Sequence, residues 1–226
     1  PLWGVGALAA GVGGALWLCH PKWIAALQRE WLWDLLIAAA ALALYVATLA
    51  PSVLPGDSGE FQVAVPTLGI PHPTGYPLYL VLGKLFTLLP VGSPAYRLNL
   101  FSAFAAAGAV WAVYRAGRAL GFYRAAALIG AALLAVSETF WGQATIAEKY
   151  ALHAFFVAAT LWLGLSWRAA RLGGGRGQRW LIAWALCYGL SLAHHRTMFL
   201  LAPVYLGLFW ATDGVRWAPL PLLLTI

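Results

Sequence analysis

The segment from Pro51 to Tyr79, PSVLPGDSGEFQVAVPTLGIPHPTGYPLY, determines how this chain is interpreted. It places two acids, one histidine, six prolines and four glycines between long apolar runs. The acids are Asp57 and Glu60, and the histidine is His72. An ionisable group beside apolar spans is energetically costly, so by default it marks a pathway or a reaction centre. We therefore expect the chemistry of the protein in this segment.

The composition of the chain is that of a helical membrane protein. Of its 226 residues, 62% are hydrophobic and 9% are charged, and the mean hydropathy is +0.78. These values exclude a soluble globular domain. The apolar runs are continuous and lack the two-residue alternation of barrel strands, which predicts helices. Basic residues cluster in short loops between the runs, a pattern typical of membrane orientation rather than of nucleic-acid binding.

The apolar runs predict an all-α polytopic membrane protein with about seven or eight spans. They cover Leu2–Cys19, Leu32–Ala50, Tyr76–Leu89, Leu98–Tyr114, Ala125–Val136, Ala151–Trp167, Trp180–Ala193 and Met198–Thr212, with a further run from Trp217. We expect residues 1–226 to form a single transmembrane domain, the amino-terminal portion of a longer protein.

The run Tyr76–Leu89 decides the topology. It is fourteen residues long, contains Lys84 and ends before Pro90. A span needs about 20 residues, so a run of this length is more often interfacial or re-entrant. If it does not cross, ten Lys and Arg residues lie on the cytoplasmic side of the membrane and four lie on the opposite side. If it crosses, five Lys and Arg residues lie on the cytoplasmic side and eight on the opposite side, with Lys84 inside the span. The positive-inside rule favours the non-crossing model.

The non-crossing topology predicts an extracytoplasmic loop over residues 51–97 that carries interfacial helices. It also places the polar residues outside the spans on one extracytoplasmic face: Asp57, Glu60, His72, Arg97, Glu138, Glu148, Lys149, His194, His195 and Arg196. Such convergence is what an active site facing the periplasm, the lumen or the cell exterior requires.

The motif GDSGEF has two interpretations. Asp57 follows the turn signal Pro55-Gly56 and is placed to cap a short helix, with Glu60 at the capping-box position. The alternative is a catalytic carboxylate, and a capping carboxylate would also be rigidly held. In GIPHPTGYPLY, the two X-Pro steps around His72 force an extended backbone, which would present His72 and Tyr76 in fixed positions.

Two further groups follow later in the chain. Glu148 directly precedes an apolar run, so we expect it at the membrane entry of a span, with a plain surface charge as the alternative. His194, His195 and Arg196 form a candidate anion site because arginine binds phosphate in a bidentate manner and histidine donates. Arg97 is a second candidate cation, with an interfacial snorkelling arginine as the alternative.

Other signatures are absent from the sequence. It contains no Walker loop, HExxH, GxSxG or dinucleotide glycine pattern. Cys19 and Cys187 are each isolated within apolar runs, where cysteine is usually a small core residue. The acids are compatible with a divalent metal, but the sequence does not indicate one, and we predict no metal ligands.

The motifs together resemble a known family. In order, GDSGEF, GIPHPTGYPLY, YRLNLFSAF, WGQATIAEKYALHAFF and GLSLAHHRTM resemble the membrane O-mannosyltransferases of eukaryotic receptor glycosylation. They also resemble the bacterial relatives of that family, formerly grouped as a domain of unknown function. The resemblance runs from about Leu32 to Pro203. More distantly, the chain looks like the GT-C class of polyprenyl-phosphate-sugar transferases, in which the first extracytoplasmic loop carries an acid and interfacial helices.

This resemblance implies a GT-C-like helical bundle that transfers a sugar, expected to be mannose, from a polyprenyl-phosphate carrier to a serine or threonine hydroxyl. Transfer would invert the anomeric carbon, and Asp57 would be the general base or would orient the acceptor hydroxyl. The residues expected to contact acceptor or sugar are Glu60, His72, Tyr76 and Glu148. Those expected to bind the donor phosphate are Arg97, His194, His195 and Arg196. The expected partners are the lipid-linked donor, a protein acceptor and the bilayer, with no obligatory cofactor and no nucleic acid.

Two other function classes remain open at this point. One is a membrane transporter in which the same acids bind a proton or a substrate. Transporters, however, tend to place their key groups at the bilayer midplane on broken helices of repeated halves. The other is a noncatalytic membrane subunit that retains the fold within a larger assembly.

Overall fold

The computed structural model describes residues 29–214, and within these residues the chain is helical and contains no strand. The chain divides into two compact units, residues 1–36 and 37–226. In the described part they hold α3 (Glu30–Ala47), which crosses the boundary, α4 (Asp57–Thr67), α5 (Pro77–Thr87), α6 (Pro94–Ala119), α7 (Arg124–Val136), α8 (Glu138–Ala144), α9 (Lys149–Leu172), α10 (Gln178–His194), the 3₁₀-helix η1 (Arg196–Leu201) and α11 (Ala202–Asp213).

Helices α6 and α9 form the centre of the second unit. Both are built from small residues on the faces that meet, and Ala112, Ala158 and Ala159 form a buried cluster between them. Small side chains let two helices approach closely, which is how helices pack where lipid removes the usual hydrophobic driving force. Gly108 shows the same effect, because a Cβ there would lie 2.9 Å from the ring of Phe155. Cys187 packs against the alanine cluster, as expected of a core cysteine, whereas Cys19 lies outside the described residues.

The helix termini carry the expected local signals. Ser93 caps α6 by accepting a hydrogen bond from the backbone N–H of Tyr96, and Pro94 occupies the first helical position. Helix α9 ends before the glycine-rich turn, and α10 begins after Gly177, whose φ of 64° favours glycine. At that end of the bundle, Arg171 of α9 pairs with Asp213 of α11 at 3.0 Å.

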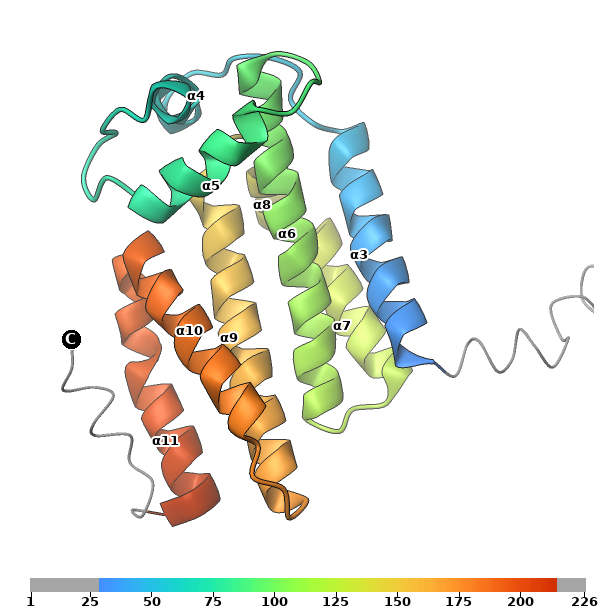
Figure 1. The fold of residues 1–226 in the computed structure, drawn as a ribbon. Coiled ribbons are helices and arrows are strands. Elements are labelled where there is room, and N and C mark those ends of the chain that lie inside the picture. The colour runs from blue at the N-terminus through green and yellow to red at the C-terminus, as the bar shows by residue number, and fades with distance from the viewer. Residues whose placement is uncertain (1–28, 215–226) are drawn as a thin grey trace, which may run out of the picture. The chain divides into compact units, whose positions relative to one another are not determined.

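Helices α4 and α5 lie across the end of the bundle at which α6 and α9 begin (Figure 1). The chain leaves α3 and returns to α6 at this same end, because the side chain of Asn99 donates to the carbonyl of Ala50 at 2.7 Å. Helix α5 has 11 residues, a rise of about 16 Å, against the roughly 30 Å of a bilayer core. It is therefore too short to be a span, as the sequence predicted.

Within residues 29–214, three helices, α3, α6 and α9, are long and apolar enough to cross a membrane. Helices α7 and α8 meet at a bend of 68° and add a fourth if the pair is one span. Helices α10 and α11 are shorter, at 17 and 12 residues. The described residues thus support a helical membrane domain with fewer spans than the expected seven or eight, and two of the predicted runs, Leu2–Cys19 and the one from Trp217, lie outside them.

Candidate functional site

The first turn of α4 carries both acids of the GDSGEF motif. The turn begins at Gly56, whose φ of 71° is accessible to glycine at no steric cost, and Asp57 and Glu60 follow within the first helical turn. Acidic side chains there interact favourably with the helix dipole. The interpretation of Asp57 as the helix cap is wrong, because Gly56 occupies the N-cap position and Asp57 is the first helical residue. The carboxylate of Asp57 is therefore available for other partners.

A polar network holds this turn against α6. The backbone N–H of Leu54 donates to the side chain of Gln62 at 3.1 Å, and Gln62 donates to Asn99 at 2.9 Å. Both side chains are buried, so these bonds satisfy polar groups that water cannot reach. Gly59 lets the loop approach the helix, because a Cβ there would lie 2.4 Å from the carbonyl oxygen of Leu54.

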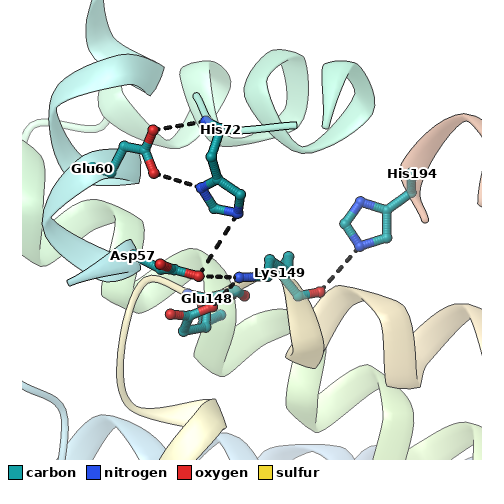
Figure 2. Close-up of polar contacts among 7 residues, drawn as sticks. Asp57, Glu60, His72, Glu148, Lys149 and His194 are labelled. Carbon is teal, nitrogen blue, oxygen red and sulfur yellow. Dashed lines mark hydrogen bonds and ion pairs between the residues drawn. The ribbon is translucent and has the colours of Figure 1, made fainter. Parts of the chain in front are cut away.

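Glu60 holds His72 at two points. Its Oε1 accepts from the backbone N–H of His72 at 2.7 Å, and its Oε2 lies 2.5 Å from the ring Nδ1 (Figure 2). These hydrogen bonds lower the pKa of Glu60. On the other side of the ring, Nε2 faces the Oδ2 of Asp57 at 3.7 Å. The stiff loop predicted from the flanking prolines is thus also tied to α4 by a carboxylate.

Lys149, the first residue of α9, lies at the centre of the cluster. Its residue surface is only 3% exposed, and its Nζ lies 2.5 Å from Oδ2 of Asp57 and 3.4 Å from Oε2 of Glu148 (Figure 2). The side chain of Asp57 is 50% exposed, whereas Glu148 is buried. One buried ammonium therefore joins a solvent-accessible carboxylate to an inaccessible one.

The two carboxylates that share Lys149 have opposite electrostatic character. The hydrogen bond from Lys149 lowers the pKa of Asp57. Burial raises the pKa of Glu148, although the charge of Lys149 acts in the opposite direction. Apart from its ion contact with Lys149, the Oε2 atom of Glu148 is buried without a hydrogen-bond partner. Asp57 is therefore the carboxylate whose ionised form is favoured, and it is also the one that is open to solvent.

Tyr76 lies between this cluster and the histidines that follow α10. Its ring centroid is 5.4 Å from that of His72, 6.0 Å from that of His195 and 5.7 Å from the Nζ of Lys149. Its backbone φ of 44° is left-handed, which is uncommon for a non-glycine residue and typical of functional positions. The ring is buried, so its packing holds the backbone in this conformation.

The three consecutive residues at the end of α10 differ in their surroundings. His194 is buried, and its Nε2 lies 3.0 Å from the carbonyl of Lys149. His195 is half-buried, and its Nδ1 lies 2.7 Å from the hydroxyl of Thr197. Arg196 is exposed. The structure thus brings His194 and His195 to the same end of the bundle as the acids, with His194 packed beneath Lys149 and Arg196 open to solvent.

Arg97 lies at the other end of α5. Its three donor nitrogens face the backbone carbonyls of Thr87, Val91 and Gly92 at 2.6, 2.6 and 3.0 Å. Thr87 is eleven residues beyond Tyr76, about 16 Å along a helix. The structure therefore does not bring Arg97 together with the other predicted phosphate ligands.

A metal is compatible with only part of this arrangement. Asp57, Glu60 and His72 offer ligand atoms that lie within 4.8 Å of one another. However, both oxygens of Glu60 already bind His72, and the oxygen of Asp57 nearest the histidine binds the ammonium of Lys149. A divalent cation would have to displace Lys149 from a pairing that also serves the buried Glu148.

The sequence-based interpretation did not include Lys149 among the site residues. Its spacing from Asp57 is 92 residues, and a lysine at the start of a span resembles an ordinary interfacial charge. The signal that could have identified it is its position beside Glu148 on the face with few cations. Gln62 and Asn99, which position the first turn of α4, were also missed because neither side chain belongs to a charged motif.

Comparisons with known proteins identify the family of the chain. The family model of the protein O-mannosyl-transferase TMEM260 N-terminal domain matches residues 57–216. Protein O-mannosyl-transferase TMEM260 of Mus musculus is 34% identical over 169 residues, covering 73% of this chain and 23% of that protein. The protein of the same description from Dictyostelium discoideum is 28% identical over 132 residues, covering 57% of this chain and 16% of its own.

The chain therefore spans less than a quarter of the length of either relative. No solved structure shows a significant match. The family model covers most of the chain and begins at Asp57, the residue on which the acidic cluster is built. On these grounds the chain belongs to the protein O-mannosyl-transferase TMEM260 family, and the part of that family it matches is the N-terminal domain.

Proposed function

We propose that the protein of which this chain is the N-terminal domain transfers mannose from a polyprenyl-phosphate carrier to a serine or threonine hydroxyl of a protein. The observation that carries this proposal is the exposed carboxylate of Asp57, which the buried ammonium of Lys149 holds at the first turn of α4. Membership of an O-mannosyl-transferase family supports the reaction class. The lipid-linked donor is a substrate, and the proposal needs no further cofactor.

In this reaction Asp57 orients the acceptor hydroxyl. A carboxylate accepts hydrogen bonds only, and the side chain of Asp57 remains half exposed while it is paired with Lys149. Attack then proceeds in line at the anomeric carbon, with inversion and an oxocarbenium-like transition state. Fixing the hydroxyl in this geometry contributes to the rate by removing the entropic cost of orientation.

The phosphate of the donor is assigned to the cationic side of Tyr76. Lys149, close to the ring of Tyr76, contributes positive charge. His195, which also packs against Tyr76, and the neighbouring exposed Arg196 supply hydrogen-bond donors for the phosphate. Phe199 and Leu200 lie three and four residues after Arg196 and are strongly exposed, so an apolar surface suited to a polyprenyl chain lies close to the cations in the chain. As the carbon–oxygen bond breaks, these groups stabilise the phosphate charge that develops. Arg97 has no part in this assignment because its donors face backbone carbonyls.

The membrane placement proposed for the site is extracytoplasmic, within a GT-C-like multi-span protein. Charge counting supports the side, and the short helix α5 supports an interfacial position for residues 51–97. Exposed apolar residues on this segment include Val63, Ile70, Val81 and Leu85, which suits contact with lipid. Asp57, Lys149 and His194 all lie at helix ends rather than mid-span. That position fits an interfacial enzyme better than a transporter with a site at the bilayer midplane.

The test is mannosyl transfer by the full-length parent protein in membranes, with labelled polyprenyl-phosphate-mannose and a Ser/Thr-rich acceptor. Asp57→Asn should lower transfer by about 100-fold or more, since it removes the acceptor-orienting charge. Asp213→Asn is the matched control, because it also breaks a carboxylate ion pair, with Arg171, some 22 residues or about 33 Å further along α9. The proposal fails if the parent protein transfers no mannose, or if both variants behave alike.

A further inference from the structure

We propose that His72 is the catalytic base that takes the proton from the acceptor hydroxyl, and that Glu60 is the residue that positions it. This inference rests on the proposed function and divides the work within the cluster: Asp57 orients the hydroxyl and His72 deprotonates it. The geometry that carries it is the two-point contact between Glu60 and His72, together with the position of Nε2 opposite Asp57.

The contact with Glu60 determines which ring nitrogen is free. A carboxylate accepts hydrogen bonds and donates none, so the Nδ1 atom that lies 2.5 Å from Glu60 must carry its proton. The neutral ring then presents an unprotonated Nε2 on the opposite side. The second bond, from the backbone N–H of His72 at 2.7 Å, prevents the loop and the ring from turning independently. This is the arrangement of a base oriented by a carboxylate, as in serine hydrolases, where the third group is the hydroxyl of the nucleophile.

The free nitrogen points to the place where an acceptor hydroxyl would be held. Nε2 lies 3.7 Å from Oδ2 of Asp57, too far for a hydrogen bond and close enough for one hydroxyl to direct its single proton between the two acceptors, each about 3 Å from the hydroxyl oxygen. The lone pair of His72 Nε2 faces the carboxylate of Asp57, and this arrangement is unfavourable unless a proton donor lies between the two groups. A serine or threonine hydroxyl supplies that donor, and both side chains that would bind it are partly exposed.

Between the two neighbours of that hydroxyl, His72 is the better proton acceptor. The Oδ2 atom of Asp57 already accepts from Lys149, and this hydrogen bond lowers the pKa of the carboxylate. Histidine is the side chain that most often serves as a general base, and the Nε2 atom of His72 has no hydrogen-bond donor among the contacts described above. Asp57 therefore keeps its charge and orients, whereas the imidazole takes the proton.

The groups that face His72 also suit the charged form it would acquire. Asp57 and Glu60 approach the ring from α4, Tyr76 packs against it from the start of α5, and Lys149 of α9 lies beyond Asp57. Two carboxylates on the near side and one ammonium further away leave a surplus of negative charge at the ring. An imidazolium formed during the reaction is thereby stabilised.

The step balances as follows. The hydroxyl oxygen of the acceptor forms a bond to the anomeric carbon while its proton passes to Nε2 of His72. The bond between the anomeric carbon and the phosphate oxygen breaks, and its electron pair leaves with the polyprenyl phosphate. The proton on His72 is then lost to water or to the departing phosphate, which restores the neutral ring. No oxidant, reductant or additional reactant is needed.

The experiment uses the full-length parent protein in membranes and compares His72→Gln and His72→Gly with the wild type. Both variants should lower kcat by about 100-fold or more with little change in the donor KM, because a general base contributes about 10²–10⁴-fold. Imidazole added in solution should restore transfer by His72→Gly about tenfold or more, which a purely structural role would not produce. His153→Gly is the matched control, because it opens a similar space nearby, and imidazole should not restore any activity it loses.

Glu60→Gln gives a second measurement. The substituted side chain would still fill the space, but its amide could no longer accept at both oxygens, so the pH profile of kcat should shift while donor KM stays constant. The inference is overturned if His72→Gln keeps more than about a tenth of the wild-type kcat, or if imidazole restores nothing to His72→Gly in folded protein. A wild-type protein that transfers no mannose would instead overturn the proposed function itself, which separates the two failures.

Discussion

Removing the ammonium of Lys149 should destabilise the protein mainly through Glu148 rather than through Asp57. At an effective dielectric constant of about 20, the 3.4 Å contact with Glu148 corresponds to about 5 kcal/mol of Coulomb attraction before desolvation. Breaking a buried pair by removing one partner typically costs about 3–5 kcal/mol, because the remaining charge is left uncompensated. The contact with Asp57 is shorter, but that carboxylate is half exposed and its pair is worth about 1 kcal/mol or less.

The pH dependence of this loss has a defined sign. Burial raises the pKa of Glu148, and Lys149 acts to lower it, so Lys149→Met raises it further. A carboxyl group whose folded pKa is raised contributes stability below its unfolded pKa and loses that contribution as the pH rises through the folded value. The destabilisation by Lys149→Met should therefore be largest well above the folded pKa of Glu148, and it should shrink as the pH falls through that value and Glu148 takes up a proton.

The assay is thermal unfolding of the full-length parent protein in detergent, repeated at several pH values from about 4.5 up to about 8.5. A loss of about 3 kcal/mol in a domain of this size corresponds to a fall in Tm of about 6 °C or more. The double variant Lys149→Met/Glu148→Gln should recover most of that fall at the higher pH, because it leaves no buried charge. Lys149→Met/Asp57→Asn should recover little. Equal recovery in the two double variants, or a Tm loss independent of pH, would refute this reasoning.

Three other substitutions test the scaffold. Gly59→Ala brings a Cβ to 2.4 Å from a backbone carbonyl oxygen, so it should lower the free energy of unfolding by about 1–3 kcal/mol and remove most of the transfer activity. Gly142→Ala is the control, because a Cβ there meets open space and should change neither quantity. Similar Tm values for the two variants would contradict this prediction. Asn99→Leu should lower stability by about 1–3 kcal/mol by leaving the buried amide of Gln62 without its acceptor, and an unchanged Tm would argue against the network. Arg97→Gln should lower Tm by removing bonds to three carbonyls while leaving the donor KM unchanged, so a raised donor KM would restore Arg97 to the phosphate site.

Much of the helical architecture followed from the sequence. The predicted runs Ala125–Val136 and Trp180–Ala193 correspond to α7 and α10 with nearly the same bounds. This agreement is possible because a continuous apolar run can be recognised in the sequence without knowing which residues pack against it. The short run Tyr76–Leu89 became the 11-residue α5 for the same reason. The run from Met198 to Thr212 was less well predicted, since it divides into η1 and α11.

The contacts of the charged residues could not be predicted in the same way. From the sequence, Arg196 and, as a second candidate, Arg97 were both expected to bind phosphate, yet Arg97 faces backbone carbonyls and Arg196 is exposed. Whether Asp57 capped α4 depended on the backbone angles of Gly56, which the motif leaves open. In each case the answer depends on which atoms the rest of the chain brings within about 3 Å.

The sequence by itself determined the class of the protein, its all-helical character and the segment that carries its acids, because hydropathy, proline placement and motif order are properties of the chain alone. Tertiary structure alone decided that Lys149, 92 residues from Asp57, would be buried beside it. It also turned Glu60 toward His72 and left Glu148 inaccessible. The physical reason is range: hydrophobic periodicity acts between neighbours in sequence, whereas pairing, burial and pKa are set by neighbours in space.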